Sequence, residues 1–85
     1  MDITLPLLKK GAKGLQVSML QTLLNLKTEA ETDLATDGIF GPKTEAAVRG
    51  WQETQQLGVD GIVGPETWTS ILEFDDEDQT IVRNL

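Results

Sequence analysis

The chain has 85 residues, enough for one domain with a modest core and too few for two. It contains no Cys and no His, which excludes disulfide frameworks, Ser-His-Asp triads and the usual zinc sites, so we expect neither a metal nor a cofactor. The net charge of −7 makes nucleic acid and anionic membrane surfaces unsuitable partners.

Residues 1–10 are predicted to be extended, because Pro6 disfavours a helix immediately before it. Leu5, Leu7 and Leu8 are candidates to pack against the rest of the fold. The segment lacks the long apolar region of a signal peptide, and its charges follow the apolar residues. Apolar runs elsewhere are only a few residues long, so no transmembrane segment is expected.

The first helix is predicted over residues 15–26, after a loop at residues 11–14. Its apolar residues recur at helical spacing in two adjacent rows, which together form a wide apolar face. The first row contains Val17, Leu20 and Leu24, and the second contains Met19, Leu23 and Leu26. This pattern predicts a core helix with both rows inside. Residues 27–36 are polar and weakly patterned, so we expect a loop there.

The sequence DGIFGPKT at residues 37–44 (the first octet) returns as DGIVGPET at residues 60–67 (the second octet), an offset of 23 residues. Six of the eight positions are identical, which indicates an internal repeat. In each octet, Asp-Gly predicts a turn in which glycine takes a positive φ, two apolar residues predict a buried plug, and Gly-Pro predicts a helix start. We therefore predict helices over residues 42–54 and 65–72, with Gly58 ending the first of them.

The predicted fold class is all-α: a compact three-helix bundle with two repeated Asp-Gly-x-x-Gly-Pro-x-Thr loops that lead into helices. The side chains expected inside the second and third helices are Ala47, Val48, Trp51, Gln55, Trp68, Ile71 and Leu72. Residues 1–72 form the predicted domain. Residues 73–85 form a predicted acidic tail, since five acids fall within Glu73–Asp78, and we expect this tail to be dispensable for the fold.

Three stretches within residues 8–72 resemble the peptidoglycan-binding domain family, the small three-helix modules attached to cell-wall hydrolases. They are Gly14-x-x-Val17-x-x-Leu20-Gln21-x-x-Leu24, the first octet continued to Trp51-Gln52, and Leu57-x-Val59 followed by the second octet and Trp68. The resemblance implies a non-catalytic, monomeric module that binds the glycan strand and stem peptide of bacterial peptidoglycan. A cell-wall hydrolase, in cis or in trans, is the implied partner. The implied location is the periplasm or the cell wall, if the protein is exported.

We expect the ligand to lie in a shallow groove between the octets, near the starts of the second and third helices. Backbone N–H groups at helix starts lack intrahelical partners and favour anionic or carbonyl ligands. The two octet aspartates are expected to hold the turns, and an edge of Phe40 or Trp68 to supply an apolar floor. The residues assigned to ligand binding are Asp37, Phe40, Gly41, Thr44, Asp60, Val63, Gly64, Thr67 and Trp68.

The same residues allow other interpretations. Asp37 and Asp60 could form a catalytic carboxylate pair, which is disfavoured because carboxylates in Asp-Gly turns normally bond their own backbone. Gln21 and Gln52 could bind ligand amides, although bonding inside the fold is favoured because buried amides are normally satisfied there. A protein-docking or pro-segment-like module on the same fold is the alternative function.

Overall fold

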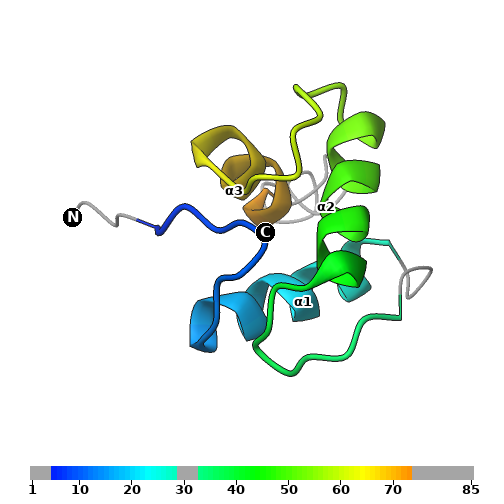
Figure 1. Ribbon diagram of the computed structural model, residues 1–85. Helices are drawn as coiled ribbons and strands as arrows, with labels where there is room; N and C mark the ends of the chain where they lie inside the picture. The colour runs from blue at the N-terminus through cyan, green and yellow to red at the C-terminus, as the bar shows by residue number, and fades with distance from the viewer. Residues whose placement is uncertain (1–4, 29–32, 74–85) are drawn as a thin grey trace, which may run out of the picture.

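The computed structural model describes residues 5–28 and 33–73 (Figure 1). This part of the chain contains three helices, α1 (Leu15–Lys27), α2 (Pro42–Thr54) and α3 (Pro65–Leu72). The predicted all-α, three-helix fold is confirmed, and the observed bounds differ from the prediction only in that α1 extends to Lys27. The predictions for the tail beyond residue 73, and for residues 29–32 of the loop, lie outside the described residues.

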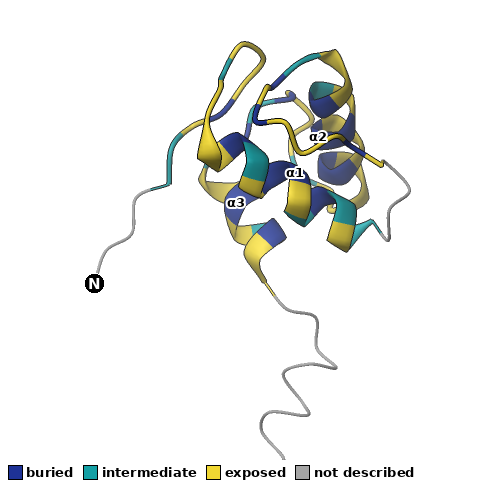
Figure 2. Ribbon diagram, turned by 90° about the horizontal axis from the view of Figure 1, so that it is seen from below, coloured by how far each residue is buried: buried dark blue, intermediate teal, exposed yellow. Residues whose placement is uncertain are grey.

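Helix α1 packs against both α2 and α3, and the buried side chains gather where the three helices meet (Figures 1 and 2). The buried apolar residues are Leu8, Val17, Leu20, Leu24, Leu34, Phe40, Ala47, Val48, Trp51, Val63, Trp68 and Ile71. This set confirms the first apolar row of α1 as core. Phe40 and Val63 occupy the plug positions of the two octets, as predicted.

The prediction that both apolar rows of α1 are buried is wrong. Met19 is 45% exposed and Leu26 is 70% exposed, while Leu23 is only partly buried. The buried residues of α1 form a single stripe, because α2 and α3 cover only one side of it. Gln55 and Leu72 were also expected inside and are exposed, since each stands at the last turn of its helix, where no neighbour covers it.

The segment before α1 pairs with both octets. Leu8 and Val63 exchange two backbone hydrogen bonds, of 3.1 and 2.8 Å, in an isolated antiparallel bridge. Further along, the backbone N–H of Gly11 donates to the carbonyl of Phe40 at 2.9 Å. The prediction that Leu8 packs against the bundle is confirmed, whereas Leu7 is 60% exposed. The segment before α1 therefore connects the two octets through backbone hydrogen bonds. The pattern of its side chains does not predict these bonds.

Helix α2 ends at Thr54 as predicted, but the residue that terminates it is Gln56 and not Gly58. Gln56 takes the left-handed conformation, with φ of 61°, that terminates a helix. Its N–H donates to the Glu53 carbonyl at 3.1 Å, and the Leu57 N–H donates to the Gln52 carbonyl at 2.9 Å. This is the Schellman arrangement, which satisfies the last carbonyls of the helix. The prediction that Gly58 ends the helix is therefore wrong.

Replacing Gln56 by glycine should raise the free energy of unfolding by about 1 kcal/mol, because glycine adopts a left-handed φ without steric cost. Urea unfolding followed by circular dichroism measures the change. Gly58→Ala is the matched control, since Gly58 has no positive φ and a Cβ there would meet nothing within 4 Å. A destabilised Gln56→Gly variant would contradict the role assigned to this residue.

Candidate functional site

Each octet is held by a glutamine that reaches it from the preceding helix. The Nε2 of Gln21 in α1 donates to the Thr44 hydroxyl and to the Ile39 carbonyl, both at 3.0 Å. It also donates to Asp37 Oδ1 at 3.1 Å, and its Oε1 accepts from the Gly38 N–H at 3.0 Å. One side chain thus connects the turn, the plug and the helix start of the first octet.

Gln52 in α2 makes the same set of bonds to the second octet. Its Nε2 donates to Asp60 Oδ1 at 2.9 Å, to the Ile62 carbonyl at 3.0 Å and to the Thr67 hydroxyl at 3.1 Å. Its Oε1 accepts from the N–H groups of Gly61 and Asp60, at 3.0 and 3.1 Å. The internal repeat therefore includes the glutamine as well as the octet.

Both glutamines act inside the fold. Gln21 and Gln52 are each 1% exposed, and no buried side-chain nitrogen or oxygen in the described part of the chain lacks a hydrogen-bond partner. An amide that already uses its donors and its acceptor within the protein has nothing left for a ligand. The favoured interpretation of these residues is confirmed, because both amides bond inside the fold.

The octet aspartates are committed to their turns. The pKa of the Asp37 carboxyl lies below its ordinary value, mainly because the Ile39 N–H bonds it at 3.0 Å and secondarily because Gln21 does. The pKa of Asp60 is lowered by the same two causes at equivalent positions. A glycosidase pair needs one carboxyl with a raised pKa, so that it stays protonated and can act as the acid. Two lowered pKa values argue against the catalytic pair.

The predicted glycine conformations are confirmed. Gly38 has φ of 76° and Gly61 has φ of 73°, both in the region that side chains other than glycine rarely adopt. In each octet this turns the backbone so that the glycine N–H meets the buried glutamine while the preceding aspartate stays at the surface. The Asp-Gly pair therefore explains the local geometry of both loops.

Two open hollows lie beside the octets, one for each. The first groove lies beside the first octet and measures about 370 Å³, and the second groove lies beside the second octet and measures about 490 Å³. Nine residues line the first groove, and each has an equivalent that lines the second. Eight of these pairs share the 23-residue offset, and the ninth is Gln21 with Gln52. Each groove is lined by one octet, so the structure contains a pair of grooves where we expected a single groove between the octets.

The residues assigned to binding fall into three groups in the structure. The buried ones are Phe40, Thr44, Val63, Thr67 and Trp68, the half-buried ones are Gly41 and Gly64, and the exposed ones are Asp37 and Asp60. The expectation of an apolar floor from Phe40 or Trp68 is not met, because these side chains are 1% and 3% exposed. The Trp68 indole donates to the Pro6 carbonyl at 2.7 Å, which fixes it in the core. Ile39, which is 50% exposed, contributes exposed apolar surface to the first groove, together with Ala35 and Pro42.

Some residues that shape the grooves were missed in the sequence. Leu34 lines the first groove and Leu57 the second, at the same 23-residue offset as the octets. The repeat thus begins three residues before each aspartate, and this match was visible in the sequence. Asn25 holds Leu34 in place through a reciprocal pair of bonds, 2.9 Å from its Nδ2 to the Leu34 carbonyl and 2.8 Å from the Leu34 N–H to its Oδ1. Nothing in the pattern of α1 marks Asn25 for this role.

Within residues 5–28 and 33–73, no cluster of three or more acidic, His or Cys side chains could hold a metal ion. No helix in the same ranges is long and apolar enough to cross a membrane.

Comparison with known proteins points to one family. The family model described as a peptidoglycan binding domain matches residues 13–71. The chain is similar to the SleB N-terminal domain, with 34% identity and a TM-score of 0.71, over 79% of this chain and 89% of that one. It is similar to a Burkholderia AP3 phage endolysin, with 37% identity and a TM-score of 0.71, over 84% of this chain and 27% of that one. No curated protein matches the chain.

A third similar structure is a peptidoglycan-binding protein from Clostridioides difficile in complex with glutamine hydroxamate. The identity is 35% and the TM-score 0.72, over 78% of this chain and 40% of that one. The chain therefore spans most of the SleB domain but less than half of the other two proteins.

Proposed function

Because this chain belongs to the peptidoglycan-binding domain family, we propose that it is a non-catalytic module that binds bacterial cell-wall peptidoglycan at its two grooves. The observation that carries the proposal is the repetition: the chain builds the same open hollow twice, each time at the start of a helix. A repeated polymer such as peptidoglycan suits a module with two similar contact points.

Free backbone donors support the assignment of the grooves. The described residues offer no hydrogen-bond partner to the backbone N–H groups of Lys43 and Thr44 at the start of α2. The same holds for Glu66 and Thr67 at the start of α3. Such groups favour carboxylate and carbonyl oxygens, and the stem peptides of peptidoglycan carry both. The groups that contact the ligand directly are therefore the main-chain N–H donors and the exposed residues at the rim of each groove. The octet aspartates hold the turns.

Non-catalytic action follows from the state of the polar side chains. The octet carboxylates are bonded in their turns, and the two glutamines are buried and satisfied. Neither groove therefore contains two free carboxylates of the kind that a glycosidase uses. The endolysin that contains a similar unit in 27% of its length suggests a partner that cleaves the wall, in cis or in trans. The proposed place of action is the cell wall or the periplasm.

Affinity for soluble fragments should be weak, because shallow grooves fix few contacts and bury little surface. Binding to intact wall gains from two grooves on one molecule and from many ligand repeats on the polymer. A monomer with two such weak sites can hold a wall-associated protein near its substrate and still allow that protein to move along the wall.

The test is sedimentation of the full chain with insoluble peptidoglycan. The protein should appear in the pellet with the wall and remain in the supernatant with cellulose, an insoluble glycan that lacks stem peptides. Equal amounts in both supernatants would reject the proposed function. In that case a protein-docking or pro-segment-like role, which uses the same fold without a wall ligand, becomes the better explanation.

A further inference from the structure

The two grooves differ in charge at one equivalent position. Lys43 lines the first groove, and Glu66 lines the second at the same place. The other charged residue of each groove is the octet aspartate, which is present in both and is bonded within its own turn. Among the residues that line the two grooves, this is the position at which the charge differs, while Arg49 lies near Asp60 beside the second octet without lining its groove.

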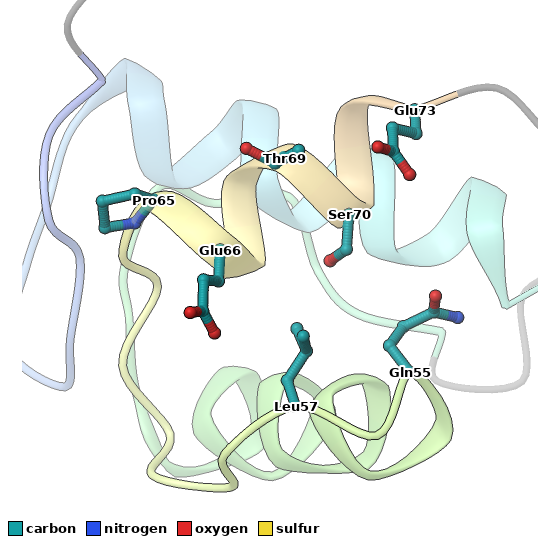
Figure 3. Close-up of a pocket in the computed structure, with 7 residues that line it drawn as sticks. All are labelled: Gln55, Leu57, Pro65, Glu66, Thr69, Ser70 and Glu73. Carbon is teal, nitrogen blue, oxygen red and sulfur yellow. The ribbon is translucent and has the colours of Figure 1, made fainter.

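The surroundings of the second groove add further negative charge. A third hollow of about 440 Å³ adjoins it, and the two share Leu57, Pro65 and Glu66. Figure 3 shows Glu66 at the start of α3 pointing into this hollow, with Glu73 just past the opposite end of the helix. An anionic ligand that entered the second groove would meet the Glu66 carboxylate, which disfavours its binding there.

Lys43 has no structural task that explains its charge. No ion pair or side-chain hydrogen bond engages it within the described ranges. It stands in the first turn of α2, where the helix dipole disfavours a positive charge, whereas Glu66 in the equivalent turn of α3 is favoured there. Lys43 is therefore an exposed cation on the rim of an open groove, where its charge can act on a ligand.

We propose that the first groove, and not the second, takes a carboxylate-bearing segment of the stem peptide, and that Lys43 selects it. This inference rests on the proposed function. The ammonium group of Lys43 supplies the charge, and the free N–H groups of Lys43 and Thr44 supply directed donors for the same oxygens. The second groove keeps equivalent donors but repels the anion through Glu66, so it is left for uncharged parts of the polymer.

The experiment is a titration of the nitrogen-15-labelled full chain, followed by backbone amide shifts. The probes are two soluble disaccharide tripeptides that differ only in whether the peptide carboxylates are free or amidated. With the free acid, the shifts should concentrate on residues 34–44. Lys43→Gln should weaken binding of the free acid about two- to five-fold, the range expected of an exposed ion pair. Binding of the amidated probe should not change.

The matched variants lie in the second groove. Glu66→Gln should not weaken binding of the free acid, and Glu66→Lys should add shifts on residues 57–67 by creating a second cationic site. Thermal unfolding checks that every variant is folded, and loss of stability in Lys43→Gln is not expected because the helix dipole already disfavours that charge. Equal weakening of both probes by Lys43→Gln, or shifts confined to the second groove, would overturn the proposal.

The outcome can be separated from the proposed function itself. If intact wall sediments wild type and Lys43→Gln alike, and the free acid shifts residues outside the first groove, the selection by Lys43 is refuted while wall binding stands. If neither protein sediments with wall and neither probe shifts any amide, both proposals fall together.

Discussion

Replacing Gln52 by leucine should lower the free energy of unfolding by about 3 kcal/mol or more, because it removes the amide that holds the second octet. Leucine has a similar volume but no polar atom. The N–H of Gly61, the carbonyl of Ile62 and the hydroxyl of Thr67 would each lose a partner in a buried setting. A loss of this size is a large part of the 5–15 kcal/mol that ordinary domains have. Urea unfolding of wild type and variant measures it.

Gln21 and Gln16 test whether the loss of stability comes from the broken hydrogen bonds or from replacing any glutamine by leucine. Gln21→Leu should cost about as much as Gln52→Leu, since it breaks the equivalent set of bonds in the first octet. Gln16→Leu, at an exposed position of the same helix, should change the free energy of unfolding by less than about 0.5 kcal/mol. Equal effects at Gln16 and Gln21 would refute the role assigned to the amide network.

Gln52→Glu adds a readout that a loss of packing cannot produce. The introduced carboxyl would be buried beside the Asp60 carboxylate. Burial and the neighbouring negative charge each disfavour its ionised form, so its pKa in the folded state should lie above the unfolded value of about 4.3. A raised pKa in the folded state means that the variant is least destabilised below about pH 4, where the new carboxyl is protonated, and loses stability as the pH rises. Gln52→Leu should show no such additional pH dependence.

The helices could be predicted because their determinants are local. Pro at the first helical position and Gly before it set the starts of α2 and α3, and those bounds agree with the structure. The end of α2 could not be assigned so readily, because Gln56 takes a conformation that glycine normally marks. Apolar spacing also overestimated the core of α1, since spacing identifies faces that can be buried but not how many neighbours exist to cover them.

The two grooves were harder to predict than the fold. Gln21 and Gln52 are 31 residues apart, whereas the octets are 23 apart, so alignment of the octets alone does not pair the glutamines. A helical glutamine also looks like a surface residue until the loop that it bonds is in place. The pairing of Leu8 with Val63 depends on main-chain bonds between distant segments, which side-chain patterns do not record. The octet sequences thus identified where the grooves lie, while their separation and lining required the fold.

The second large effect distinguishes the two octets. Gly38→Ala should cost about 3 kcal/mol in free energy of unfolding, and Gly61→Ala only about 1–2 kcal/mol. The positive φ contributes about equally at both positions, since the angles are 76° and 73°. The difference lies in what a Cβ would meet. At Gly38 it would approach the Gly14 carbonyl oxygen to 3.1 Å, and that backbone is held by the bond from the Gly14 N–H to the Gly38 carbonyl.

At Gly61 the Cβ would instead approach the side chains of Arg49 and Glu45, both to 3.1 Å. These are flexible side chains that can turn away, so the cost there is mainly that of the backbone angle. Gly50→Ala is the control with the opposite sign: it lies inside α2 with nothing within 4 Å, so it should stabilise the fold by about 0.5–1 kcal/mol. Equal losses for Gly38→Ala and Gly61→Ala would mean that the positive φ alone sets the loss in free energy of unfolding. The backbone before α1 would then move easily to accommodate the added Cβ. A larger loss at Gly38 would mean that this chain is held firmly against the first octet, and that the first groove is the more rigid of the two.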